Sequence, residues 1–296
     1  MNPARWDPDG EAMPQHFVCL TFDFDNASPA IAREMTTPTM ISRGDFGMVA
    51  AERLVGLMAR HAIATTWFTP GHTIETYPAS VRAVFEAGHE IAHHGWTHRV
   101  PASLSREEEE QELIRGNAAI KALTGRNARG YRSPAWDLSP HSIELLLKHG
   151  FTYDSSLMGH DYLPYQARDG DVVSLHEPIR YGPDTPLVEM PISWSLDDYP
   201  VFEYMRTPTG TNAGLMNADL VGRNWLDDFR YMAGHYDWGV LTYTFHPHVI
   251  GRGHRLIMLE GLIGKLKDAG AIFVTLEQAV AEYRARYPDG RSERGG

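Results

Sequence analysis

Apolar runs with strand character alternate with amphipathic runs along most of the chain, and this alternation constrains the fold more than any other feature of the sequence. The strand-like runs end near residues 23, 68, 93, 132, 154, 192, 245 and 276, and helical spacing occupies 45–61, 78–87, 105–123, 139–150, 256–267 and a last segment to residue 286. A repeated strand-helix unit predicts a parallel sheet. About eight strands is the number of a closed (β/α)8 barrel, in which active-site groups gather at the carboxyl ends of the strands. We therefore expect an α/β barrel with its functional groups at one rim.

Chemically active side chains stand at or just after the ends of these predicted strands. Asp23 and Asp25 end the first apolar run, His94 follows the third, Arg132 ends the fourth, and His246 follows the run 240–245. Polar residues placed at random would not be distributed in this way. These five residues are the first candidates for a functional site.

Two acidic and two histidine residues have the spacing of a metal site. The two-residue period of a strand places Asp23 and Asp25 on one side, with Phe24 turned away. Neighbouring carboxylates repel each other unless a cation or an arginine lies between them. His94 and His98 are four residues apart, and two imidazoles with a carboxylate suit Zn²⁺ and similar ions. Three protein ligands leave a coordination position open, which points to catalysis and to hydrolysis of an acyl group.

The order of four motifs resembles that of the polysaccharide deacetylase (NodB-homology) family, carbohydrate esterase family four. The motifs are Thr-Phe-Asp-x-Asp (21–25), His-x-x-x-His (94–98), Arg-x-Pro (132–134) and an apolar strand that ends in His246, and they span residues 21–248. The resemblance implies a deformed, TIM-like barrel of seven or eight strands. It also implies a metal-dependent hydrolase of carbon-nitrogen amide bonds that removes N-acetyl groups from amino sugars.

Roles for individual residues follow from the same resemblance. It implies a general base at Asp23, ligands of one divalent ion at Asp25, His94 and His98, an arginine that holds the base at Arg132, and a general acid at His246, with His248 as its rival. Zinc is the expected ion, and cobalt, manganese and nickel are the alternatives. The residues that adjoin these motifs and are expected to contact substrate are Trp96, Pro134 and Trp136.

The first motif departs from the usual family pattern, in which adjacent aspartates are followed by glycine. Here Phe24 separates the aspartates, which leaves open which of them holds the ion. The variant is similar to members that include cyclic imide hydrolases, relatives of a metal-free allantoinase and proteins called peptidoglycan deacetylases. Two alternatives to deacetylation follow: ring opening of a cyclic imide or ureide, and a carbohydrate-binding barrel without catalysis. We expect a small cyclic imide or a short acetylated saccharide to be a better substrate than a long polymer.

Charge and cysteine content restrict the partners and the compartment. The chain has 27 basic and 38 acidic residues, a formal charge of −11, and no basic cluster, so nucleic acid and membrane partners are not expected. The single cysteine, Cys19, is predicted to be a small core residue, and no intramolecular disulfide can form. Because the sequence shows no signal-peptide core and no membrane-spanning run, we expect a cytoplasmic location. We also expect a homo-oligomer, a dimer or a tetramer.

One barrel domain is predicted over residues 16–287, with an N-terminal extension over 1–15 and a disordered tail over 288–296. Two long stretches interrupt the alternation. The first, about 159–186, is expected to be a lid or a subunit contact. The second, about 193–235, is rich in aromatic residues that either line a substrate groove or pack against the barrel or a neighbouring chain. Within it, Asp197 and Asp198 are expected to be loop caps.

Overall fold

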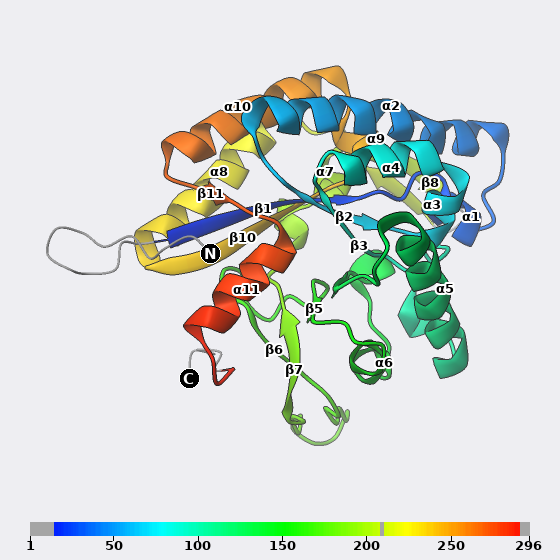
Figure 1. Cartoon of the computed structure of the whole chain (residues 1–296), viewed down its shortest axis with the longest axis vertical. Coiled ribbons are helices and arrows are strands. Elements are labelled where there is room, and N and C mark those ends of the chain that lie inside the picture. The colour runs from blue at the N-terminus through cyan, green and yellow to red at the C-terminus, as the bar shows by residue number, and fades with distance from the viewer. Residues whose placement is uncertain (1–14, 208–209, 291–296) are drawn as a thin grey trace, which may run out of the picture.

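A curved sheet surrounded by helices forms the body of the molecule (Figure 1). The computed structural model describes residues 15–207 and 210–290. Nearly all of the predicted N-terminal extension (1–15) and most of the predicted disordered tail (288–296) lie outside these residues. The arrangement confirms the predicted α/β class.

The main sheet has the strand order β10-β1-β2-β3-β4-β5-β7-β6, and β11 pairs with β1 beside this path. Its pairings are parallel except for that of β6 with β7. The strands are β1 (Gln15–Asp23), β2 (Thr66–Thr69), β3 (Glu90–His93), β4 (Gly130–Tyr131), β5 (Tyr153–Asp154), β6 (Tyr165–Arg168), β7 (Asp184–Glu189), β10 (Trp238–Phe245) and β11 (Ile272–Phe273). A separate antiparallel hairpin joins β8 (Tyr204–Thr207) to β9 (Gly210–Ala213).

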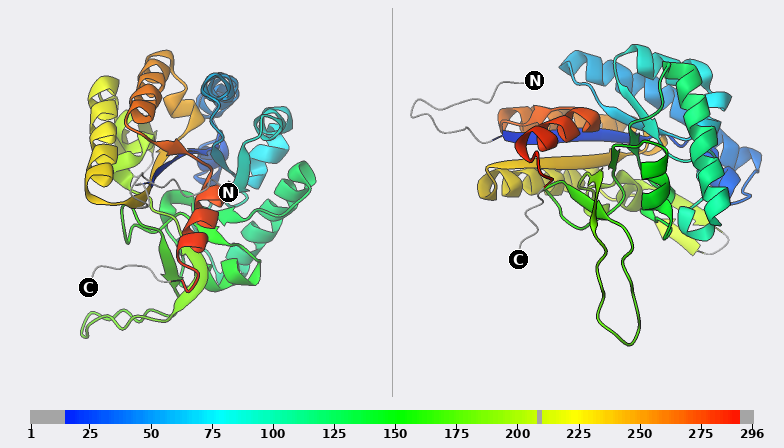
Figure 2. Two further views of the ribbon diagram at one scale, coloured as in Figure 1. Left: turned by 60° about the vertical axis from the view of Figure 1, so that its left-hand side comes forward. Right: turned by 60° about the horizontal axis from the view of Figure 1, so that its bottom comes forward.

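Helices cover the outer face of the curved sheet, as Figure 2 shows from two further sides. The α-helices are α1 (Ser28–Ala32), α2 (Pro38–His61), α3 (Gly71–Thr76), α4 (Pro78–Glu86), α5 (Arg106–Thr124), α6 (Ser142–Lys148), α7 (Asp198–Phe202), α8 (Ala218–His235), α9 (Pro247–Ile250), α10 (Gly253–Asp268) and α11 (Leu276–Arg286). Short 3-10 turns lie at η1 (Pro101–Ser103), η2 (Pro134–Trp136) and η3 (Trp194–Leu196). No helix in the described part of the chain is long and apolar enough to cross a membrane.

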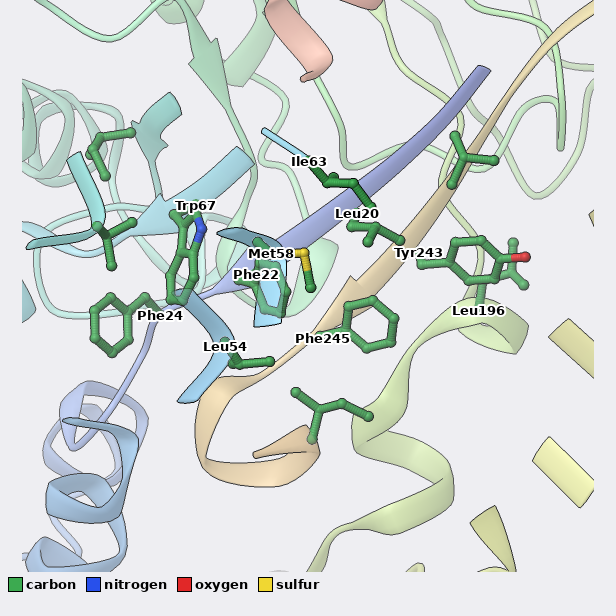
Figure 3. Packing of buried hydrophobic residues seen from close by; sticks show 14 of the residues in the cluster. Leu20, Phe22, Phe24, Leu54, Met58, Ile63, Trp67, Leu196, Tyr243 and Phe245 are labelled. Atoms are coloured by element: carbon green, nitrogen blue, oxygen red, sulfur yellow. The ribbon is translucent and has the colours of Figure 1, made fainter. Parts of the chain in front are cut away.

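Strand β1 is buried from Phe17 to its end, which explains why it is apolar on both faces. Its Phe22 stacks on Trp67 of β2 with ring centroids 4.5 Å apart, and Phe24 meets the same indole edge-on at 5.2 Å. Leu54 and Met58 of α2 belong to the same cluster (Figure 3). Burial of a side chain of this size contributes about 1.5–3 kcal/mol. The cluster therefore fixes the carboxyl end of β1.

Irregular chain completes the barrel between its two sheet ends. Among the described residues, β10 and β6 do not pair with each other. Instead the Val240 N–H donates to the Tyr162 carbonyl at 2.8 Å, and Asp197 forms an isolated parallel bridge with Thr244. The barrel is thus deformed rather than closed by a continuous ladder, as the family resemblance implies.

Most predicted elements are present with shifted ends. Helix α2 begins at Pro38 instead of residue 45, and strands β4, β5 and β11 are only two residues long. Ser105 forms a capping box with Glu108 at the start of α5. The first interruption adds β6 to the sheet, and the chain between β6 and β7 extends away from the barrel (Figure 2).

The second interruption contains a helix that was not predicted. Helix α8 begins after Asn217, whose side chain accepts the Leu220 N–H. It buries Val221, Trp225 and Phe229, which recur every four residues. This cap and spacing are a helix signal that the many aromatic residues of the stretch obscure.

The side chain of His93, the last residue of β3, turns into the interface with α5. Its Nδ1 accepts the Gly95 N–H at 3.1 Å, and its Nε2 lies 3.1 Å from the Leu113 carbonyl oxygen. Gly116 permits this approach, because a Cβ there would lie 2.3 Å from His93 Nε2. The start of the loop that carries His94 is held in place by these contacts.

Candidate active site

The carboxyl end of β1 supplies two buried carboxylates. Asp23 ends the strand and Asp25 follows two residues later, and both are almost inaccessible to solvent. Phe24 lies between them, points into the core, and donates its N–H to the Phe68 carbonyl at 2.8 Å. Asp23 and Asp25 therefore share a side, and Phe24 is too deeply buried to form a wall for substrate.

Asp25, His94 and His98 come together at the ends of β1 and β3. His94 Nε2 lies 3.4 Å from Asp25 Oδ1, and His98 Nε2 lies 3.5 Å from Asp25 Oδ2. His94 Nδ1 lies 2.7 Å from the Arg132 carbonyl oxygen, and donation of its proton there leaves Nε2 free to act as a ligand. Burial and the neighbouring His94 lower the pKa of His98, which favours the neutral imidazole that binds metals.

These three residues fit a divalent ion. Their potential ligand atoms lie within 4.8 Å of one another. In the described part of the chain, Asp25 Oδ1 is buried without a hydrogen-bond partner, and a cation would satisfy it. The carboxylate-imidazole-imidazole set has the donor chemistry of zinc sites that keep an open position. The sequence-predicted ligands are thus brought together by the fold.

Asp23 is held by an arginine that reaches across the barrel from the end of β4. The fully buried Arg132 donates from Nη1 to Asp23 Oδ1 at 2.7 Å and to Thr21 Oγ1 at 2.9 Å. Ser155 accepts at its carbonyl from Nε and at its hydroxyl from Nη2, at 3.1 and 3.0 Å. Burial pushes the pKa of Asp23 upward, but the Arg132 charge and hydrogen bond, with the nearby histidines, hold it below its usual value. Asp23 is therefore an ionised carboxylate in a fixed position.

His246 approaches the same carboxylates from the end of β10. Its Nε2 lies 3.8 Å from Asp25 Oδ2 and 4.0 Å from Asp23 Oδ2. Its Nδ1 lies 2.8 Å from Asp198 Oδ1, and Asp198 also accepts the backbone N–H of His246 at 3.0 Å. Burial alone would lower the pKa of His246, but the Asp198 hydrogen bond and the charges of Asp197, Asp198 and Asp25 hold it well above its usual value. The imidazolium form, with its Nε2 proton aimed at the site, is favoured.

Asp198 is a site residue that the sequence pattern did not reveal. Asp197 caps the following turn, as predicted, through the Tyr199 N–H at 2.8 Å, but Asp198 orients an imidazole instead. Asp197, Asp198 and His246 also lie close enough to form a second group of potential metal ligands. Because His246 Nδ1 is already engaged with Asp198, this group is explained as a hydrogen-bonded pair. Asp198 begins the short helix α7 and is 48 residues from His246, so no spacing rule connects them.

A cavity of about 220 Å³ lies above these groups. Its apolar wall includes Trp136 and Trp194, whose rings stack with centroids 3.9 Å apart. The lining residues come from every side of the barrel rim: Asp23, Asp25, Pro29, Arg33, His98, Ala135, Trp136, Trp194, Asp197, Tyr199 and His246. Trp136, a predicted substrate contact, therefore lines the cavity, and Trp194 and Tyr199 from the second interruption line it as well.

Three other candidates lie outside the lining of this cavity. The Trp96 ring lies under the Arg115 guanidinium, 3.3 Å from its centroid, and meets His72 edge-on. Pro134 lies behind the wall, beside Gly95. His248, the rival acid, has its Nε2 3.9 Å from Glu203 Oε2. Adjacency to a motif in the sequence did not bring these side chains into the cavity.

Several residues of the rim have left-handed backbone conformations that side chains other than glycine rarely adopt. The φ angles are 50° at Asn26, 59° at His98, 56° at Ala135 and 55° at Trp136. Such conformations cost of order 1–3 kcal/mol each and persist where the surroundings impose them. Here the four residues lie in three loops. Asn26 follows the Asp pair, His98 is the second histidine of the ligand set, and Ala135 and Trp136 belong to the indole wall.

A second carboxyl pair lies behind Arg132, at the adjoining ends of β5 and β7. Asp154 and Glu189 are register partners and are fully buried. Glu189 Oε1 accepts the N–H groups of Ser156 and Leu157, both at 2.8 Å, and Asp154 Oδ1 accepts the Ser156 hydroxyl at 2.8 Å. Burial raises the pKa of Asp154 to about 6, and burial and the Asp154 charge raise the pKa of Glu189 well above its usual value. The pair retains a proton when ordinary carboxyl groups have lost theirs.

This pair predicts a stability that falls with rising pH. Because both pKa values are raised in the folded state, the pair's contribution is fully present below about pH 4, where unfolded carboxyl groups titrate, and is lost as pH rises through about 6. Glu189→Gln keeps an acceptor for the two N–H groups and a donor for Asp154. In denaturant unfolding with chelator present, the free energy of unfolding of wild type should fall between pH 5 and 9. That of the variant should fall by at least about 1 kcal/mol less over the same range.

Glu52→Gln, at an exposed position of α2, is the matched control and should follow wild type at every pH. Parallel curves for wild type and Glu189→Gln over this range would contradict the shared proton.

The chain is similar to known proteins in sequence and in fold. The sequence profile described as polysaccharide deacetylase matches residues 10–153. The chain is 36% identical over 264 residues to the peptidoglycan deacetylase of Helicobacter pylori, covering 85% of this chain and 90% of that protein. Among solved structures, a Mycobacterium smegmatis protein assigned as a polysaccharide deacetylase has a TM-score of 0.79 at 30% identity, over 97% of this chain and 94% of that one. The structure of PuuE allantoinase has a TM-score of 0.73 at 17% identity over 93% and 92%, which shows a common fold.

Proposed function

Because the chain belongs to the polysaccharide deacetylase family, and is thus an enzyme that acts on carbon-nitrogen bonds other than peptide bonds, we propose that this site removes the N-acetyl group of an amino sugar with one divalent ion. The observation that carries the proposal is the meeting of three groups around one cavity. These are the ligand set Asp25, His94 and His98, the Asp23–Arg132 pair and the His246–Asp198 pair. A barrel that only bound carbohydrate would need neither of the two pairs.

The mechanism assigns the proton transfers to residues of this chain. Asp25, His94 and His98 would hold the ion, which when bound supplies a Lewis acid for the amide carbonyl. Asp23, kept ionised by Arg132, accepts a proton from the water that attacks the carbonyl carbon. His246, oriented by Asp198, donates the Nε2 proton to the nitrogen as the carbon-nitrogen bond breaks. The stacked Trp136 and Trp194 exclude water from one side of the cavity.

The finer features of the proposal concern the ion and the assembly. Zinc is the proposed ion, since imidazole and carboxylate donors suit it, and cobalt, manganese and nickel are the alternatives. A cytoplasmic homo-oligomer stays a prediction from the sequence.

The cavity supports a small amide or a short acetylated saccharide as substrate. Its volume of about 220 Å³ is below the roughly 300–1,000 Å³ of sites that enclose drug-sized ligands. The flat Trp136 wall also favours a second candidate, a planar cyclic imide or ureide whose ring is opened by the same groups.

A substrate screen tests the proposed function. Acetate release from N-acetylglucosamine and its short oligomers should exceed release from polymeric chitin or peptidoglycan in kcat/KM. Ring opening of small cyclic imides, followed by ultraviolet absorbance, tests the second candidate in parallel. Faster release from either polymer than from any small amide would contradict the small-substrate proposal.

The ligand assignment predicts which substitutions remove the ion and which leave it bound. Asp25→Ala or His98→Ala should abolish binding of one divalent ion per chain, because each removes a ligand from a buried three-residue set. Asp23→Asn should retain the ion, since Asp23 is bonded to Arg132 instead. Elemental analysis of the purified variants measures this. Unchanged metal content in both ligand variants would refute the assignment.

The acid assignment predicts a difference between two histidines. His246→Ala should lower kcat by about 10²- to 10⁴-fold with little change in metal content, the usual effect of removing a positioned proton donor. His248→Ala should lower kcat much less, because His248 lies beside Glu203 and outside the cavity lining. Steady-state kinetics with metal analysis decides, and the opposite ranking would transfer the role to His248.

A further inference from the structure

Most ionisable side chains that line the cavity have another ionisable side chain within ion-pair distance. Asp23 is paired with Arg132, Asp25 lies beside His94 and His98, and Asp197 lies 3.6 Å from His246 Nδ1. Arg33, by contrast, makes one hydrogen bond, from Nη1 to the Pro29 carbonyl at 3.2 Å. Within residues 15–207 and 210–290, no carboxylate lies within ion-pair distance of its guanidinium.

The position of Arg33 at the cavity makes its guanidinium, which has no carboxylate partner among the described residues, relevant to substrate. Arg33 directly follows the last residue of α1, the short helix after the loop that carries Asp25, and its exposed side chain forms part of the cavity rim. Its charge acts on Asp25, His98 and Tyr199, so the guanidinium is close to the ligand set and yet bonded to none of it. A bound divalent ion would repel Arg33, so the arginine is not placed to assist the metal.

Two further arginines, Arg43 and Arg252, lie near His248, outside the lining of the cavity. Arg43 acts electrostatically on Tyr199 and on His248, and Arg252 acts on His248. Glu203 neutralises Arg43 through an ion pair, and Arg252 lies over the Phe46 ring at 3.6 Å. The opposite wall, formed by Ala135, Trp136 and Trp194, carries no charge. A ligand in the cavity would therefore meet a cation on one side and flat apolar rings on the other.

We propose that the N-acyl substrate carries a carboxylate, and that Arg33 binds this carboxylate and so determines specificity. The inference rests on the proposed function and adds the substrate class to it. A guanidinium matches a carboxylate with two parallel hydrogen bonds, which gives direction as well as attraction. The carboxylate would hold the substrate with its acyl group over the ligand set and its remaining surface along the Trp136 wall.

A matched pair of compounds tests the proposal. N-Acetylmuramic acid differs from N-acetylglucosamine by a lactyl ether that bears one carboxylate. Calorimetry on chelator-treated protein, and kcat/KM on the metal-loaded enzyme, should both favour the carboxylated compound by roughly 10- to 100-fold, the effect of a hydrogen bond to a charged group. The methyl ester of N-acetylmuramic acid should lose this preference.

Variants at Arg33 assign the preference to its guanidinium. Arg33→Met should reduce the preference to less than about threefold, Arg33→Lys should leave an intermediate value, and Arg33→Glu should favour the neutral compound. Arg60→Met, at an exposed arginine of α2 that is paired with Glu260, is the control and should keep the full preference. Thermal unfolding of each variant shows whether it is folded, and the ester comparison on wild type tests the proposal without any variant.

The outcomes separate this inference from the proposed function. Equal binding of the two compounds by wild type, or a preference that survives Arg33→Met, would overturn the role of Arg33 even if acetate is released. Preferential binding of the carboxylated compound without acetate release would support Arg33 and would overturn deacetylation as the reaction.

Discussion

The buried contact between Arg132 and Asp23 is the interaction on which the rest of the site depends. It joins the end of β4 to the end of β1, across two intervening strands, and the same guanidinium also bonds to Thr21 and Ser155. A guanidinium without accessible surface is stable only when its donors are satisfied, so each partner has to be in place. The carbonyl of the same arginine also orients His94. One residue thus couples the position of Asp23, the proposed general base, to the orientation of His94, a proposed metal ligand.

Strand geometry explains why so few residues suffice for the rest. In a parallel sheet all carboxyl ends meet at one rim, so Asp23, His94, Arg132 and His246 converge although they come from four separate strands. The aromatic cluster around Phe22 and Trp67 holds β1 against β2 and leaves the end of β1 little freedom. The chemistry is therefore placed by the packing of the core, and the loops mainly shape the cavity above it.

What could be predicted from the sequence follows the same division. The alternation of strands and helices predicts a parallel sheet, whose carboxyl ends bring Asp25 and His94 to one rim, whereas His98 lies on a loop and was identified through the family motif. Asp198 and Trp194 could not be placed, since they lie in a stretch of short helices whose path depends on contacts with distant residues such as His246 and Trp136. Trp96 shows the opposite case, a residue near the motif in sequence but not in the cavity. It follows His94 by two residues, yet the loop turns its ring away from the cavity, where it packs under Arg115. Helix α8 had a usable signal in Asn217 and the spacing of its buried face, but the aromatic content of the stretch was interpreted only as groove lining or as packing against the barrel or a neighbouring chain.

The gap between the two ends of the sheet has a consequence for how enzymes of this design can diverge. The segment that crosses the gap pairs with β10 through Asp197, supplies the carboxylate that orients His246, and provides Trp194 for the cavity wall. A change that reshapes the wall for a new substrate therefore acts on the same few residues that hold His246. Substrate range on this side of the barrel cannot drift freely under mutation, whereas the exposed Arg33 side chain can vary without disturbing the orientation of His246. New specificities are thus expected to arise first at that exposed position.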